Sequence, residues 1–209
     1  MYVPVGGLPI ISLDAGGSYT PDTNRISVKE VQDLRGRQGE GPGTAWFHEC
    51  GHYIDFNFVT DPKAFFAATG QRPPQVSNLP SFVEALKRDV GEYERQETVR
   101  SHCSLKEARN IIGARFDNVI GGLSNGIQDI FGGVLGERYP NPTNTDTHYT
   151  VTFGHDSQYW KEESRNLPAE AFAHMFEAAF SPQKRILMGK IFPTAYPKFM
   201  EILEDLSVC

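Results

Sequence analysis

A chain of 209 residues, of which 39% are hydrophobic and 22% are charged, has the size and composition of one ordinary globular domain. This composition excludes a disordered or collagen-like chain. The 20 Lys and Arg residues and the 26 Asp and Glu residues give a formal net charge of −6, which disfavours non-specific binding to nucleic acid. The apolar runs are short and interrupted by glycine, and the first ten residues lack a signal-peptide pattern, so we expect neither a membrane span nor secretion.

The chain is expected to begin with a few short strands. Runs typical of strands occur at Leu8–Leu13 and Arg25–Val28, and the segment GGSYTPDTN between them indicates a turn or hairpin loop. A further strand fits residues 148–153. Helices are expected over residues 44–58, 61–68, 81–100, two parts of 104–135, and from about Pro168 to the C-terminal region. The sequence therefore predicts an α+β fold that is mostly helical and has a small β-sheet.

The most informative motif is HECGH at residues 48–52. Each residue of an α-helix turns by about 100°, so His48 and His52 lie about 40° apart and can reach the same metal ion. Glu49 lies beside them, where it can take a proton from a water molecule that the ion activates. The opposite face carries apolar side chains and is expected to pack into the core: Phe47, Cys50, Ile54 and Phe58. The alternative is a surface helix whose polar side chains make ordinary contacts.

A catalytic zinc ion needs a third protein ligand beside two histidines. The segment PAEAFAHMFEAAF at residues 168–180 offers Glu170, His174 and Glu177 on one face of an otherwise apolar helix. Buried charged groups are unfavourable unless they are paired or bind a metal. This helix is therefore expected to supply the third ligand, although the same face could instead be exposed to solvent.

The pairing of HECGHYID with EAFAHMFEAAF resembles the gluzincin metallopeptidases, in which a Glu on a second helix completes the zinc site. The details most resemble metallopeptidase-type domains of phage minor head and other phage structural proteins, and the catalytic domain of anthrax lethal factor is similar in the same two motifs. GGSYTPDTNRISV, SNGIQDIFGGV and FGHDSQYW extend the resemblance over the chain from about residue 17. It implies a zincin-like core in which His48, His52 and Glu170 bind Zn²⁺ and Glu49 is the general base.

His174 departs from this resemblance, because the position four residues after the third ligand is usually acidic in lethal-factor-like sites. His174 could support the site from outside the ligand set, or it could compete with Glu170 as the ligand. Asp55 and Asp129 are further candidates for orienting the ligand imidazoles. Two residues are the leading candidates for donating a hydrogen bond to the developing oxyanion, with Tyr149 and Tyr53 behind them: His155 and Tyr159.

The separation between the two motifs is longer than in simpler gluzincins. We therefore expect a single metallopeptidase-like domain over residues 1–209, with a helical insertion at about 60–147 that covers the cleft. The function expected is a zinc-dependent endopeptidase, encoded by a phage or prophage, that hydrolyses a protein or peptide substrate by attack of metal-activated water.

The alternative is a structural or assembly protein of a phage particle that keeps the metal site as a folding staple. A closed site with His174 as a fourth ligand would favour that alternative. In either case phage particle proteins are candidate partners, no nucleic-acid or membrane partner is expected, and the protein is expected in the cytoplasm of the bacterial host or in the virion.

Overall fold

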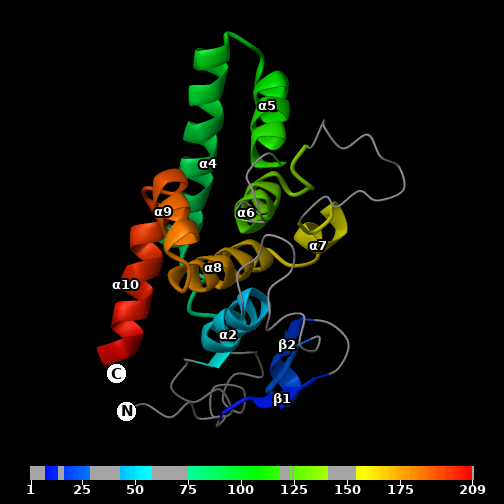
Figure 1. The fold of residues 1–209 in the computed structure, drawn as a ribbon, viewed down its shortest axis with the longest axis vertical. Helices are drawn as coiled ribbons and strands as arrows, with labels where there is room; N and C mark the ends of the chain where they lie inside the picture. Colours follow the sequence, from blue (N-terminus) through cyan, green and yellow to red (C-terminus); the bar gives the residue numbers. More distant parts are fainter. Residues whose placement is uncertain are drawn as a thin grey trace.

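The computed structural model describes residues 8–13, 17–28, 43–57, 75–117, 123, 125–140 and 154–208. In these residues the chain is mostly helical and has a small three-stranded sheet, which confirms the predicted α+β class (Figure 1). The predicted helix at 61–68 and the predicted strand at 148–153 lie outside the described residues. None of the described helices combines the length and the apolar character that a membrane span requires.

The sheet is formed by β1 (Ile10–Ser12), β2 (Ser18–Thr20) and β3 (Arg25–Ser27). The central strand is β3, which pairs in parallel with β1 and antiparallel with β2. The two predicted strand runs are β1 and β3. In contrast, β2 lies in the segment that the sequence indicates as a turn, and a single turn of 3₁₀-helix leads from it into β3.

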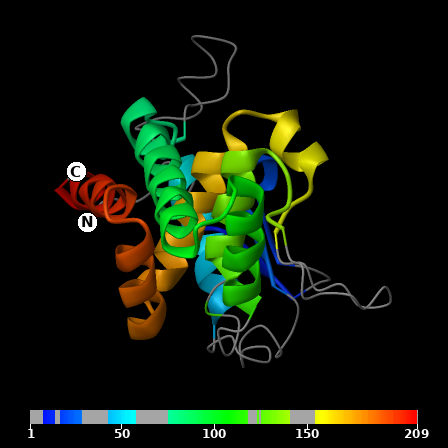
Figure 2. The same ribbon diagram turned by 90° about the horizontal axis from the view of Figure 1, so that it is seen from above.

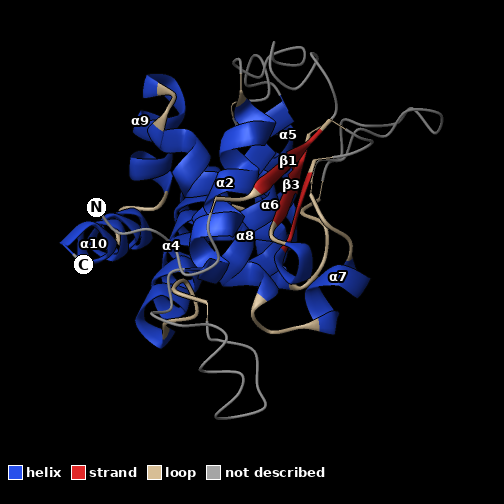
Figure 3. Cartoon of the chain, turned by 90° about the horizontal axis from the view of Figure 1, so that it is seen from below, coloured by secondary structure: helices blue, strands red, loops and turns tan. Residues whose placement is uncertain are grey.

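Helix α2 (Thr44–Asn57) lies between the sheet and α8 (Asn166–Ala179), as Figure 1 shows, and Figure 3 shows the strands from below. The two helices pack closely because Gly51 has no side chain: a Cβ atom there would lie 2.7 Å from the Cα atom of Ala173. Since α2 is covered on two sides, its buried residues are not the predicted apolar face. Phe47, Cys50 and Ile54 are only half-buried, whereas the buried positions are Glu49, Gly51, Tyr53 and Asp55.

The remaining helices surround α8. In Figure 1, α4 and α5 form a helical hairpin on the side of α8 that faces away from the sheet, and Figure 2 shows the same hairpin from above. Helix α6 packs on α8, and α9 and α10 follow α8 along the chain. Their bounds are α4 (Pro80–Ser101), α5 (Leu105–Asp117), α6 (Asn125–Leu135), α7 (Ser157–Glu162), α9 (Pro182–Ile191) and α10 (Ala195–Val208).

Among the described residues, two hydrophobic clusters hold these elements together. The larger cluster lies around α8, and its largest fully buried side chains are Phe82, Phe131, Phe172, Phe192 and Phe199. The smaller cluster, Ile26, Val28 and Tyr53, joins the sheet to α2. Ile54 packs against both clusters. Helix α2 therefore connects the sheet to the main helical core.

Candidate metal centre

A cleft of about 750 Å³ opens where β2, α2, α6, α7 and α8 meet. Nine of the residues singled out in the sequence line this cleft: His48, Glu49, His52, Asp129, His155, Tyr159, Glu170, His174 and Glu177. Of the three helices described in the stretch where an insertion was expected, only α6 lines the cleft, and α4 and α5 stand apart from it. Among these helices α6 thus lies at the cleft, while an insertion over 60–147 stays a prediction.

Three potential ligand atoms lie close together in the cleft: Nε2 of His48, Nε2 of His52 and Oε2 of Glu170. The Nε2 atoms of the two histidines are 3.1 Å apart, and Oε2 of Glu170 lies 3.4 Å from Nε2 of His48 and 3.5 Å from Nε2 of His52. In a tetrahedral zinc site with ligand bonds of about 2.0–2.1 Å, ligand atoms are about 3.3–3.4 Å apart. The three atoms therefore have the separations that a single small cation requires.

The chemistry of these atoms also requires a cation or a proton between them. Oε2 of Glu170 is buried and accepts no well-formed hydrogen bond from the described residues. Burial raises the pKa of Glu170, but the two imidazoles outweigh it and hold this pKa well below its usual range. Burial lowers the pKa of His52, yet the Glu170 carboxylate raises it overall to about 8. The centre is therefore a place of strong negative potential, which either protons or a metal ion can occupy.

Glu49 lies beside these atoms and lines the cleft. It is buried against β2, where the backbone N–H of Tyr19 donates a hydrogen bond to its carboxylate. Burial raises the pKa of Glu49, while the neighbouring imidazoles of His48 and His52 oppose that rise. A carboxylate with a raised pKa is a better proton acceptor than an ordinary one. The strand β2, which the sequence did not predict, is thus what holds Glu49 in place.

The opposite wall of the cleft carries His155 and Tyr159, whose rings stack 3.8 Å apart. The hydroxyl of Tyr159 donates a hydrogen bond to Oε1 of Glu170, and Nε2 of His155 lies 3.9 Å from the same oxygen. Both side chains therefore reach the edge of the ligand set. Asp129 fixes His155 by accepting hydrogen bonds from its backbone N–H at 2.8 Å and from its Nδ1 at 3.1 Å.

This wall owes its position to local capping and turn geometry. The Asp156 side chain caps α7 by accepting hydrogen bonds from the backbone N–H groups of Gln158 and Tyr159. Gly154, with a φ of 108°, turns the chain so that the N–H of His155 faces Asp129. An N-cap Asp before a short polar-aromatic segment was the available sequence signal for α7.

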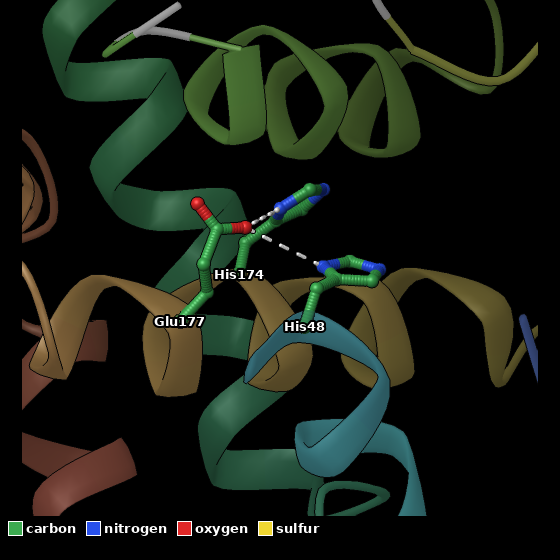
Figure 4. A group of neighbouring side chains, drawn as sticks. All are labelled: His48, His174 and Glu177. Carbon is green, nitrogen blue, oxygen red and sulfur yellow. Dashed lines mark ion pairs between the residues drawn. The ribbon is translucent and has the colours of Figure 1, made fainter. Parts of the chain in front are cut away.

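His174 lies next to the ligand set rather than in it. Its Nε2 is 3.1 Å from Oδ2 of Asp129, and its Nδ1 is 3.5 Å from Oε2 of Glu177. Burial lowers the pKa of His174, but the hydrogen bonds with Asp129 and Glu177 raise it overall to about 10. Figure 4 shows that the same oxygen of Glu177 also faces Nδ1 of His48, at 3.7 Å. Glu170, and not His174, therefore completes the triangle with the two histidines.

Charge around the cleft is unbalanced. Four carboxylates, those of Glu49, Asp129, Glu170 and Glu177, are buried together, and the buried cations beside them are Lys184 and the protonated His174. With His52 in the neutral form that metal binding requires, and His155 also neutral, these charges leave an excess of two negative charges. A divalent cation between His48, His52 and Glu170 would neutralise that excess.

Asp55 occupies a different place from the one expected. Its carboxylate accepts hydrogen bonds from the backbone N–H and hydroxyl of Ser77 and from the amide of Gln75, so it anchors the start of the next described segment to α2. It acts on His52 only through its charge. Tyr53 packs against the sheet and does not line the cleft. Tyr149 lies outside the described residues.

Comparison with models of known protein families, with curated proteins and with solved structures finds no match to this chain. The groups of side chains that could hold a metal ion, found in the described residues, are His48–His52–Glu170, His48–His174–Glu177 and Asp129–His155–Glu170.

Proposed function

We propose that this protein is a zinc-dependent endopeptidase with His48, His52 and Glu170 as the metal ligands and Glu49 as the general base. The observation that carries the proposal is the orphaned, buried Oε2 of Glu170 between two imidazole nitrogens, with a second carboxylate, Glu49, beside it in an open cleft. A site that only stabilises the fold has no need of Glu49. The ligand chemistry suits zinc, which accepts nitrogen and carboxylate oxygen ligands in tetrahedral geometry.

A bound Zn²⁺ supplies Lewis acidity, which polarises the carbonyl of the scissile peptide bond and lowers the pKa of water. Glu49 takes the proton from the attacking water and delivers it to the leaving amine. His155 and Tyr159, on the other wall, donate hydrogen bonds to the carbonyl oxygen as it gains negative charge. Asp129 keeps the His155 ring oriented for this purpose.

The resemblance of the motifs to phage structural proteins is the reason for proposing a phage or prophage origin, with phage particle proteins as candidate substrates. The corresponding locations are the cytoplasm of the bacterial host or the virion. The alternative, a metal staple without turnover, gains no support from His174, because its two ring nitrogens face Asp129 and Glu177. His48, His52 and Glu170 would hold the ion at the wall of the open cleft, where it would supply Lewis acidity to a bound substrate.

The decisive experiment compares Glu49→Gln with wild-type protein loaded with one equivalent of zinc. The zinc content and the melting temperature of the variant should stay close to those of the wild type, while cleavage of a peptide library should disappear. Glu92→Gln is the matched control, since Glu92 is an exposed carboxylate on α4 that pairs with Arg95. Loss of metal in Glu49→Gln, or cleavage that survives the substitution, refutes the role given to Glu49.

A further inference from the structure

Glu177 lies between two buried imidazole edges (Figure 4). Its Oε2 atom is 3.7 Å from Nδ1 of His48 and 3.5 Å from Nδ1 of His174. Both Nδ1 atoms are buried and have no hydrogen-bond partner of ordinary geometry in the described part of the chain, and Oε2 of Glu177 is the acceptor that faces them. An imidazole nitrogen that faces a carboxylate and nothing else carries its proton on that side. Nε2 of His48 also faces a carboxylate, Oε2 of Glu170 at 3.4 Å, but Nε2 of His52 contacts the same oxygen and lies 3.1 Å from Nε2 of His48, so only one of these two nitrogens can carry a proton there. Because Glu177 offers His48 a second acceptor at Nδ1, the arrangement favours the Nδ1 proton for His48.

That tautomer leaves the Nε2 lone pair of His48 directed at the candidate metal position. The 3.1 Å contact between the two Nε2 atoms then runs from the N–H of His52 to the lone pair of His48 when no metal is bound. Metal-binding histidines commonly donate their other ring N–H to a carboxylate, which fixes the ring and makes the ligand nitrogen more basic. Glu177 is the carboxylate in position to do this for His48.

Lys184 holds Glu177 in that orientation. Its ammonium group donates a hydrogen bond to Oε1 of Glu177, so Oε2 is the oxygen left to face the two imidazoles. Both side chains are more than nine-tenths buried, at 5% and 8% exposure. Lys184 lies in the first turn of α9, which the Ser181 hydroxyl caps, so its backbone is fixed as well.

The same three atoms, Nδ1 of His48, Nδ1 of His174 and Oε2 of Glu177, are close enough together to hold a cation themselves. The surrounding charges oppose that use. The Lys184 ammonium already occupies Glu177, and His174 has both ring nitrogens facing carboxylates, as an imidazolium does. A second cation would also need the proton of His48 Nδ1 removed while its Nε2 binds the first ion.

We propose that Glu177, held by Lys184, is a positioning residue that fixes the metal-binding tautomer of His48, and that the centre takes a single divalent ion. This inference rests on the proposed metal centre. The sequence offers Glu177 only as one of three ionisable groups on α8, and its contact with Lys184 joins it to a different helix.

The first test uses the unmodified protein without metal. Long-range ¹H–¹⁵N NMR spectra of the histidine rings should show the His48 proton on Nδ1, and a proton on Nε2 overturns the inference. This measurement needs no variant, and a merely structural role for Glu177 makes no demand on the tautomer. If the tautomer is as expected but no zinc binds at all, the proposed metal centre fails while the role of Glu177 in setting the His48 proton stands.

The second test measures zinc affinity by competition with a chromophoric chelator. Glu177→Gln and Lys184→Met should each weaken zinc binding by about 10–100-fold, with the His48 ring shifting toward a mixture of tautomers, and with a stoichiometry of one zinc per chain throughout. Glu92→Gln is the control and should bind zinc like the wild type. Unchanged affinity in Glu177→Gln overturns the inference. A wild-type stoichiometry of two that falls to one in Glu177→Gln overturns it in favour of a second metal site.

Discussion

Gly51→Ala should disrupt the metal centre without touching a ligand. The new Cβ atom would lie 2.7 Å from the Cα atom of Ala173 and 3.1 Å from Cβ of Phe176, where ordinary contacts begin at 3.4 Å. Helices α2 and α8 must therefore separate by about 0.7 Å, since the closest obstacle is backbone. That movement would lengthen the distances from Glu170 to the two histidines to about 4.1–4.2 Å, beyond the ligand separations of a tetrahedral ion.

We expect Gly51→Ala to lower the free energy of unfolding by about 1–3 kcal/mol through overpacking. It should also weaken zinc binding by roughly 10–100-fold, because misplacement of groups by about 1 Å has effects of that size on a preorganised site. Thermal unfolding and chelator competition measure the two effects. The matched control is Gly91→Ala on α4, where a Cβ meets nothing within 4 Å. That substitution should raise stability by about 0.5–1 kcal/mol and leave zinc affinity unchanged. Wild-type zinc affinity in Gly51→Ala refutes the reasoning that this helix crossing sets the ligand distances.

Zinc affinity should fall as the pH drops below about 8, because the protonated form of His52, whose metal-free pKa is about 8, cannot bind the ion. In chelator competition the loss should approach about tenfold per pH unit, and an affinity that stays constant between pH 6 and 8 contradicts this. Asp55→Ala should lower stability by about 2–4 kcal/mol in chemical denaturation, because it leaves the donors of Ser77 and Gln75 unpaired; a loss below 1 kcal/mol shows that water replaces the carboxylate. Tyr159→Phe at saturating zinc should lower kcat by about 10²–10³-fold with little change in KM, and an unchanged kcat removes Tyr159 from the reaction.

The sequence could point to the candidate ligands because much of their geometry is local. The spacing of His48 and His52 fixes their relation on any α-helix, and the ionisable groups of α8 stand out in an apolar helix. The pairing of α2 with α8 came from the resemblance of the two motifs. In physical terms it depends on Gly51, whose absent side chain permits the close crossing.

The parts that escaped prediction depend on contacts between distant segments. β2 is only three residues long and lies among turn-forming residues, so its pairing with β3 decides its conformation. The burial of α2 followed from its place between the sheet and α8, which periodicity along one helix cannot show. Glu177 was recognised as lying on the polar face of α8, but its contact with Lys184 required the turn between α8 and α9.

Because the described hydrophobic core is divided into two clusters, the two parts of the protein can differ in how easily they unfold locally. The strands bury little apolar surface of their own, and a sheet of this size does not persist in water without support. The strands pack on α2, and α2 packs in turn on α8, whose apolar side chains belong to the larger cluster. An ion that joins the two helices would therefore link the sheet to the most stable part of the protein, and its removal should let the sheet and α2 open together as one cooperative unit. The amide of Tyr19, bonded to Glu49, would report that opening through faster hydrogen exchange, while the amides of α4 stay protected.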